Sequence, residues 1–185
     1  MKIKFIVIFS LLIFLSCKNN KTEMKQEVDT RGYIVKVGDV APDFEIEYPD
    51  GRRVMLSSLR GKLVMLQFTA SWCGVCRKEM PYLESEIWQK NKGNSNFVLL
   101  GVDYKESKEV AVKFAKDMNI TYPMTLDKDG EKFDLFCGHD AGVTRNVLID
   151  KDGEIVLLTR LFEMQEFGNM VLFIGKELDN YNLHK

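Results

Sequence analysis

Residues 72–81 read WCGVCRKEMP, and they lie two residues beyond the apolar run Leu63–Thr69. A buried strand that delivers two cysteines to the first turn of a helix makes a disulfide that can open and close, because the helix N-terminus stabilises the thiolate of the first cysteine. The pattern therefore predicts a redox-active pair, Cys73 and Cys76. A bare Cys-x-x-Cys also leaves open an inert disulfide or half of a zinc site, and the preceding strand, Trp72 and Pro81 favour the redox pair.

The rest of the chain alternates strand and helix signals. Strands are expected at Phe44–Glu47, Arg53–Leu56, Leu63–Thr69, Phe97–Asp103, Asn146–Asp150 and Glu154–Thr159. Helices are expected at Cys73–Asn91 with a bend at Pro81, after the cap Ser107 with Val110, Phe114 and Met118 on one face, and at Met164–Leu178. This order predicts an α/β thioredoxin-like sandwich, in which a central mixed β-sheet is flanked by helices.

The N-terminus has the layout of a secretory signal. A basic start is followed by the apolar segment Phe5–Leu15 and by Ser16-Cys17, and the apolar segment is too short to span a bilayer comfortably. The sequence FLSC at residues 14–17 resembles a bacterial lipoprotein signal, although phenylalanine replaces the usual leucine. We expect a signal peptide at 1–16, lipid on Cys17, a flexible tether at 17–35 and one domain at 36–182. Plain secretion and an uncleaved anchor are the alternatives.

Composition excludes some partners and fits export. The chain has 26 basic and 27 acidic residues, and removal of the signal would take away Lys2 and Lys4, which leaves a net charge near −3. No basic stripe or basic domain is present, so we expect no nucleic-acid partner. Of the four cysteines, one would carry lipid, two would form the active pair, and Cys137 is left over.

Four separated motifs carry a resemblance to a known family. They are VGDVAPDF at 37–44, LRGK at 59–62, FTASWC at 68–73 and VLIDKDG at 147–153. Together they resemble the TlpA/ResA family of membrane-tethered thioredoxin-like proteins over residues 36–178. The resemblance implies protein thiol or disulfide substrates, such as apocytochrome c cysteines or misoxidised envelope proteins. It also implies recharging by a membrane thiol-transfer reductase, on the periplasmic side of a bacterial membrane.

Position in the motif suggests a role for each thiol. Cys73 lies at the helix start and should be the more acidic, attacking thiol, whereas Cys76 lies one turn inward and should resolve the mixed disulfide. We expect Trp72 to pack beside the pair and limit water access; an ordinary core tryptophan is the alternative.

Glu79 lies three residues after Cys76, on the same face of the expected helix. The resemblance implies that a glutamate at this position sits near the thiols and tunes them. A carboxylate there would raise the pKa of a thiol and could relay a proton. The alternative is a solvated glutamate paired with Arg77 or Lys78.

The loop opposite the cysteines departs from the family pattern. Family sequences carry a cis-proline six residues before the aspartate that is Asp150 here, and this chain has Thr144 there. A non-proline cis bond costs roughly 3 kcal/mol, so we expect a trans Val143–Thr144 bond and an altered substrate-docking loop of Val143, Thr144 and Arg145. Loss of the ring could let a metal approach the sulfurs. Arg145 could hold a thiolate or an acidic peptide, or be a plain surface arginine.

Cys137 and His139 lie just before that loop. A buried inert thiol is the commoner role for such a cysteine. A third redox thiol is one alternative, and a zinc site formed with His139 and the Cys-x-x-Cys pair is another.

Together these features predict a thiol–disulfide oxidoreductase, working as a reductant of protein disulfides with no cofactor beyond the Cys73–Cys76 disulfide. A thiol peroxidase is an alternative, because APDF at 41–44 is shared with peroxiredoxins. Peroxiredoxins place a proline and a threonine ahead of their cysteine, and this chain has Leu66 and Ala70 at those positions. This difference weakens the thiol peroxidase interpretation. A non-enzymatic metal-binding module that uses the cysteine pair is the other alternative.

Overall fold

The computed structural model describes residues 32–183. The predicted signal at 1–16, the lipid attachment at Cys17 and most of the predicted tether lie outside the described residues. Between residues 32 and 183, no helix is long and apolar enough to cross a membrane.

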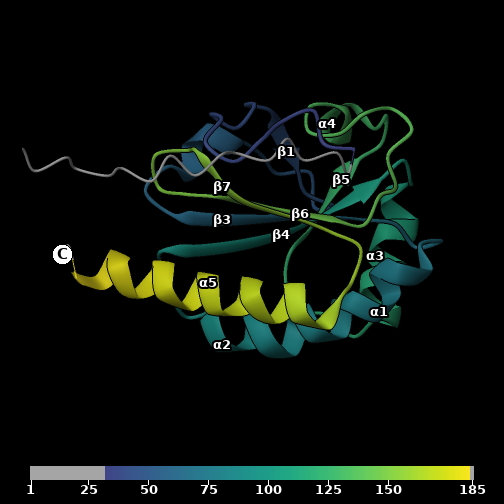
Figure 1. The fold of residues 1–185 in the computed structure, drawn as a ribbon. Coiled ribbons are helices and arrows are strands. Elements are labelled where there is room, and N and C mark those ends of the chain that lie inside the picture. The colour runs from purple at the N-terminus through teal and green to yellow at the C-terminus, as the bar shows by residue number, and fades with distance from the viewer. Residues whose placement is uncertain (1–31, 184–185) are drawn as a thin grey trace, which may run out of the picture.

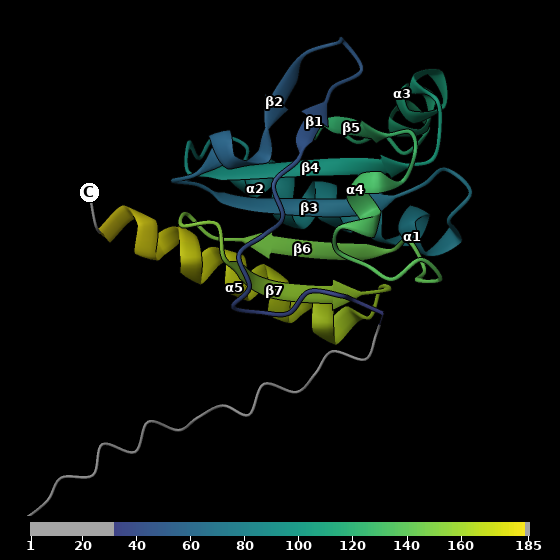
Figure 2. The same ribbon diagram turned by 90° about the horizontal axis from the view of Figure 1, so that it is seen from above.

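One seven-stranded mixed sheet forms the centre of the fold (Figures 1 and 2). Its spatial order is β2-β1-β5-β4-β3-β6-β7. The strand bounds are β1 (Glu45–Glu47), β2 (Arg53–Met55), β3 (Leu63–Thr69), β4 (Phe97–Tyr104), β5 (Met124–Asp127), β6 (Arg145–Ile149) and β7 (Ile155–Arg160). The predicted α/β thioredoxin-like sandwich with a central mixed sheet is therefore confirmed.

The pairing of the central strands places the cysteine motif. β3 and β4 run parallel with Thr69 opposite Asp103, so both strands end at the same edge of the sheet. β6 runs antiparallel to β3, so it starts at that edge, with Arg145 opposite Phe68. Every residue of β3 is buried, which explains its nearly continuous apolar sequence. The segment after β3 thus meets the start of β6 and the segment after β4.

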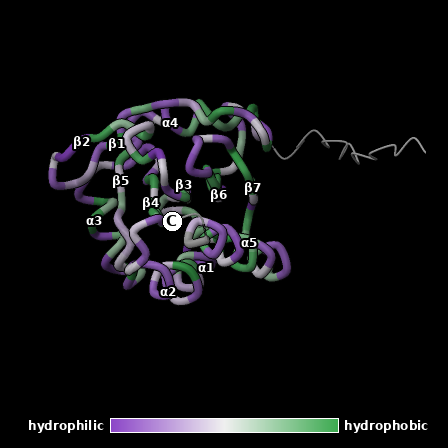
Figure 3. The backbone as a smooth tube through the Cα atoms, turned by 90° about the vertical axis from the view of Figure 1, so that its left-hand side faces the viewer, coloured by the Kyte–Doolittle hydropathy of each residue, from purple (hydrophilic) through white to green (hydrophobic). Residues whose placement is uncertain are grey.

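Helices cover both faces of the sheet unequally (Figure 1). One face carries α1 (Gly74–Tyr82), the π-helical segment η2 (Leu83–Trp88), α2 (Gln89–Asn91), α3 (Lys108–Asp117) and α5 (Met164–Leu183). The other face carries the short α4 (Glu131–Asp134), and the 3-10 turn η1 (Leu56–Leu59) follows β2. Figure 3 shows a hydrophobic β7 and an α5 of alternating hydropathy. The buried residues of α5 recur at helical spacing: Phe167, Met170, Ile174 and Leu178.

Several expected elements need correction. β5 and α4 were not anticipated, because each has only four residues, which is too few to display a hydrophobic period.

Ser107 caps α3 as expected and accepts a hydrogen bond from the Val110 N–H group (3.4 Å). Val110 itself is 39% exposed, however, and Ala111 is buried in its place. Around Pro81 the helix changes from α1 into η2, as expected where a proline removes a backbone donor.

The domain begins before residue 36, inside the expected tether. Tyr33 is buried, and its hydroxyl donates to the Thr159 carbonyl oxygen (2.5 Å). The Ile34 N–H group donates to the Phe136 carbonyl oxygen (2.9 Å). The expected tether at 17–35 is therefore too long at its C-terminal end, because the aromatic ring at position 33 anchors the chain to the β6–β7 hairpin.

We predict that Tyr33→Phe lowers the free energy of unfolding by about 1–2 kcal/mol, because it removes a buried donor from a backbone carbonyl group. Urea unfolding monitored by far-UV circular dichroism measures this. Tyr82→Phe is the matched control, since the Tyr82 ring is 42% exposed, and it should change stability little. Equal stability of both variants would contradict the anchoring role of Tyr33.

Candidate active site

The two cysteines lie at the N-terminus of α1, joined by a disulfide. Cys73 is the N-cap residue, and its Sγ atom accepts a hydrogen bond from the Cys76 N–H group (3.2 Å). The residue Cys73 is 6% exposed, and the residue Cys76 is 0% exposed. The sulfur at the positive end of the helix is thus also the one that a partner can reach, as the attacking role of Cys73 requires.

The Thr144 hydroxyl group lies against both sulfurs. Its Oγ1 atom is 3.1 Å from Cys73 Sγ and 3.2 Å from Cys76 Sγ. The Val143–Thr144 bond is trans, as expected. The expectation that loss of the proline lets a metal approach the sulfurs stays a prediction. A hydroxyl can donate to a thiolate, so Thr144 offers the sulfurs a donor that a proline lacks.

The turn between β3 and Cys73 is held by an acidic side chain from the neighbouring strand end. The Ser71 N–H and hydroxyl groups each donate to a Glu106 carboxylate oxygen at 2.6 Å. The Arg77 Nε–H group donates to the Ser71 carbonyl oxygen (2.7 Å). Sequence reasoning missed Glu106, although it lies just after β4, whose end meets the end of β3. The parallel pairing of these strands was the signal that could have found it.

Trp72 does not take the expected position. Its side chain is 65% exposed, so it is not a core tryptophan and it does not bury the pair. Trp72 directly precedes Cys73 in the chain and presents a large apolar group to solvent. Such a group suits a surface that binds another chain better than a surface that excludes water.

Glu79 is buried under α1 in a hydrogen-bonded row of polar side chains. The Asn146 amide donates to Glu79 Oε1 (2.6 Å) and to Thr159 Oγ1 (2.9 Å), and the Gln67 amide lies 3.4 Å from Glu79 Oε2. The Tyr122 hydroxyl donates to Gln67 Oε1 (2.7 Å). Gln67 and Asn146 are direct partners across β3 and β6, which puts both amides on the α1 face. The alternative of a solvated Glu79 paired with Arg77 or Lys78 is therefore wrong.

Two carboxyl groups near this edge of the sheet are shifted toward the neutral form. Burial raises the pKa of Glu79 to about 7, and the hydrogen bonds from Asn146 and Gln67 oppose that shift. Burial also raises the pKa of Asp103, opposite Thr69, to about 8, with a further contribution from the Glu106 charge. A buried carboxyl that titrates near neutral pH can take up or release a proton during thiol chemistry.

Val143 is buried in the core of the α4 face, as is Arg145 at 1% exposure. The Arg145 guanidinium group lies over the Tyr33 ring, 4.6 Å from its centroid. A plain surface arginine is therefore the wrong interpretation. The alternation of side chains along β6 directs Arg145 away from the Asn146–Glu79 side of the sheet.

Cys137 is a buried thiol outside the disulfide, and His139 is exposed. Within the part of the chain that the structure describes, no three His, Cys, Asp or Glu side chains converge to hold a metal ion. The zinc site that would combine Cys137 and His139 with the cysteine pair is therefore contradicted. The buried position agrees with the expected inert thiol.

The AhpC/TSA family model matches residues 37–158, well over half of the chain. The chain belongs to the AhpC/TSA family. Within this family it is similar to thiol-disulfide oxidoreductase ResA of Oceanobacillus iheyensis, 33% identical over 135 residues, which cover 71% of this chain and 65% of the relative. ResA of Bacillus thuringiensis subsp. konkukian is 30% identical over 150 residues, covering 79% of this chain and 82% of the relative.

Solved structures agree with this placement in the AhpC/TSA family. A Bacteroides thetaiotaomicron protein, described as a proposed protein disulfide isomerase, is 54% identical with a TM-score of 0.78 and covers 83% of this chain and 96% of its own. A Chlorobium tepidum protein, described as a proposed thiol:disulfide interchange protein DsbE, is 28% identical with a TM-score of 0.68, over 78% and 99%. The chain is a TlpA/ResA-like thioredoxin-family thiol–disulfide oxidoreductase.

We predict that Thr144→Val lowers the rate of Cys73 alkylation at neutral pH by about tenfold, because a hydrogen bond to a charged group contributes about 1.5–3 kcal/mol. Alkylation of the reduced protein by iodoacetamide across a range of pH measures the thiolate fraction. Thr144→Ser keeps the hydroxyl group and should retain most of the rate. A valine variant that reacts as fast as the wild type would exclude this role for the hydroxyl.

We predict that Glu79→Gln flattens the pH dependence of stability. The unfolded chain releases the Glu79 proton near pH 4.5 and the folded protein near pH 7, so this stabilisation is complete below pH 4.5 and is lost as the pH rises to 7. Between pH 4 and 8 the unfolding free energy of the wild type should fall by about 3 kcal/mol relative to the variant.

Chemical denaturation at several pH values measures this difference. Glu86→Gln is the matched control, because a hydrogen bond from Lys90 lowers the pKa of the exposed Glu86 carboxyl, and that variant should keep the wild-type decline. A decline of the same size in Glu79→Gln would show that Glu79 is not the titrating group.

Proposed function

We propose that this oxidoreductase works as a reductant of protein disulfides at the periplasmic side of a bacterial membrane. The observation that carries the chemistry is the position of the Cys73 sulfur. It caps α1, it belongs to the more exposed of the two cysteines, and it lies 3.1 Å from a hydroxyl group. All three features favour a reactive thiolate at Cys73 once the disulfide is reduced.

The reaction follows from the relative burial of the two sulfurs. The Cys73 thiolate attacks one sulfur of a substrate disulfide, and the other substrate sulfur leaves as a thiolate that takes a proton. The Cys76 thiol loses its proton and attacks Cys73 Sγ, which releases the second substrate thiolate and closes the Cys73–Cys76 disulfide. Two electrons pass to the substrate, and no cofactor beyond the cysteine pair is needed.

Glu79 is a positioning residue in this scheme, and its carboxyl group can exchange a proton with the cysteine pair. It lies one turn beyond Cys76 on α1 and is buried with it. Because burial raises its pKa to about 7, the Glu79 carboxyl is shifted toward the protonated form and can exchange a proton with the thiol chemistry of Cys76. The exposed Trp72 supplies an apolar contact for the substrate chain.

The envelope location rests on the sequence before the described residues. The basic start, the apolar segment and the FLSC sequence support cleavage before Cys17 and lipid attachment there. Substrates would then be envelope proteins, apocytochrome c cysteines among them, and a membrane thiol-transfer reductase would restore the dithiol. Secretion to the periplasm without a lipid is the alternative. The charge balance of the chain supports the absence of a nucleic-acid partner.

We predict that Cys73→Ser abolishes disulfide reduction, whereas Cys76→Ser forms a stable mixed disulfide with the substrate, because the inner thiol is needed for release. Turbidity from insulin reduction, followed by non-reducing electrophoresis and mass spectrometry, measures both. Cys137→Ala is the control and should stay within about threefold of the wild-type rate. If only Cys76→Ser lost adduct formation, the two roles would be reversed.

The same preparations test the alternative functions. The AhpC/TSA match and the shared APDF sequence make peroxide a reasonable second substrate to assay. Peroxide consumption that matched or exceeded insulin reduction would favour a thiol peroxidase. Metal bound after purification, together with loss of insulin reduction on metal loading, would favour a metal-binding module.

A further inference from the structure

Asp103 is a fully buried aspartate near the end of β4 that the thiol chemistry described above does not use. It is 0% exposed, and neither of its carboxyl oxygens has a hydrogen-bond partner among the described residues. The alternation of side chains along β4 puts Asp103 on the same face as Gly101, which lies opposite Gln67 on the α1 side of the sheet. A buried carboxylate that no donor faces is costly, so the neutral form of Asp103 is favoured.

Glu106 acts on Asp103 through its charge. Burial and the Glu106 charge raise the pKa of the Asp103 carboxyl to about 8, and a hydrogen bond between the two carboxyl groups adds to the shift. Two carboxylates have no proton to donate to each other, whereas a protonated Asp103 has an O–H donor and Glu106 has lone pairs that accept it. At neutral pH the two groups therefore share one proton and carry one negative charge.

Glu106 uses both of its carboxylate oxygens to hold the turn before Cys73. Oε2 accepts from the Ser71 N–H group and Oε1 from the Ser71 hydroxyl group, each at 2.6 Å. In the same turn the Cys73 N–H group donates to the Ala70 carbonyl oxygen (3.0 Å), and Cys73 then caps α1. The position of the attacking sulfur thus depends on Ser71, and the position of Ser71 depends on Glu106.

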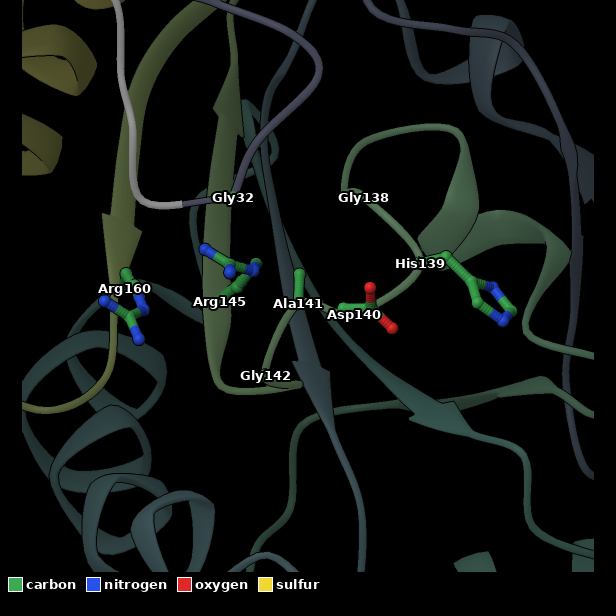
Figure 4. A pocket seen from close by; sticks show the side chains of 8 residues that line it. All are labelled: Gly32, Gly138, His139, Asp140, Ala141, Gly142, Arg145 and Arg160. Carbon is green, nitrogen blue, oxygen red and sulfur yellow. The ribbon is translucent and has the colours of Figure 1, made fainter.

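Other titratable groups lie on the elements around the end of β4. They are Glu79, Arg77 and the cysteine pair on α1, Asp127 on β5, and Lys105, Lys108 and Glu109 after β4. Arg145 and Arg160 of the β6–β7 hairpin line a cavity on the other face of the sheet (Figure 4). Within residues 32–183, Glu106 is the one group whose charge shifts the pKa of Asp103. Ionisation of Asp103 therefore acts first on Glu106.

The two carboxyl groups differ in how they can respond when both are ionised. Asp103 has no contact with solvent, whereas Glu106 is half-buried and can turn outward. Repulsion between the two carboxylates would displace Glu106, and Ser71 would then lose both of its acceptors. A proton on Asp103 keeps Glu106 in place.

We propose that Asp103 positions Cys73 for disulfide exchange by sharing a proton with Glu106, which holds the turn at Ser71. Asp103 and Glu106 are positioning residues that act through Ser71. The inference deepens the proposed function and rests on it, because the turn fixes the attacking sulfur. The turn is held at neutral pH and is released above about pH 8, when the shared proton is lost.

Asp103→Asn keeps the donor and removes the titration, since an asparagine amide can donate to Glu106 at every pH. Insulin reduction gives kcat/KM for the variant and for the wild type. We expect the variant-to-wild-type ratio to rise from about 1 at pH 7 to about 5 at pH 9, because the ionised wild type should be about tenfold slower. The ratio cancels the pH dependence of the thiols and of the substrate. A ratio of 1 at both pH values would overturn the proposal.

Asp103→Leu removes the donor altogether. It should be about tenfold slower than the wild type at pH 7 and within about twofold of it at pH 9. Glu109→Gln is the matched control, because Glu109 is an exposed glutamate three residues after Glu106, and it should follow the wild type at both pH values. A leucine variant as fast as the wild type at pH 7 would contradict the positioning role. If the leucine variant does not fold, Asp103→Asn decides the question.

Nuclear magnetic resonance of the oxidised protein tests the carboxyl pair without the thiol chemistry, because disulfide-bonded cysteines do not titrate. The carboxyl carbon signals of Asp103 and Glu106 should move together with a midpoint near pH 8. The Ser71 amide proton should shift over the same range, and it should stay in place in Asp103→Asn. Glu106→Gln should lower the midpoint of Asp103, because it removes the neighbouring charge.

These measurements separate the proposal from the proposed function. An Asp103 carboxyl that ionises below pH 6, or a Ser71 amide signal that does not respond to the ionisation of Asp103, would refute the proton-sharing pair. Failure of the wild type to reduce insulin would refute the proposed reductase function. The spectra of the oxidised protein would still show whether the pair holds the turn.

Discussion

The buried hydrogen bonds of Glu79 hold the active site together. Asn146 on β6 donates to one Glu79 oxygen, and Gln67 on β3 lies against the other, so α1 is tied to two neighbouring strands at one carboxyl group. A buried carboxyl that lost these partners would leave polar groups without compensation, at a cost of several kcal/mol. Because Asn146 lies two residues after Thr144, the same bonds bring the start of α1 against the start of β6. The contact between Thr144 and the two sulfurs follows from that alignment.

The hydrogen-bonded polar side chains around Glu79 fit beneath α1 because the neighbouring position on β4 is a glycine. Gly101 lies opposite Gln67 on β4, and a Cβ atom there would come within 2.7 Å of Met124 Sδ and 3.3 Å of the Tyr122 ring. The glycine thus admits the ring whose hydroxyl donates to Gln67. On the other side of the cysteines, Glu106 holds the turn at Ser71. The sulfurs are therefore positioned from β6, from the helix and from the end of β4, while Cys73 keeps its access to partners.

The sequence was informative where a pattern was local. The apolar β3, the Cys-x-x-Cys and the cap at Ser107 each occupy a few consecutive residues with a direct physical meaning. Glu106, Asn146 and Gln67 escaped notice because their roles depend on which strands are neighbours. A glutamine inside an otherwise apolar strand was a signal that could have been read. The exposure of Trp72 and the burial of Arg145 could not be inferred, because both depend on how the loop around Thr144 packs against distant segments.

The two edge strands of the sheet, β2 and β7, affect how the protein interacts with unfolded polypeptides. β2 has three residues, and Arg53 on it pairs with Glu45 and Glu47 of β1. At the opposite margin, Gly38 and Asp39 exchange backbone hydrogen bonds with Ile155 at the start of β7. Short, charged or covered margins resist the addition of a further strand, which is how aggregation between sheets begins. A protein that acts on the thiols of other polypeptides can thus contact extended chains at its sulfurs without recruiting them into its own sheet.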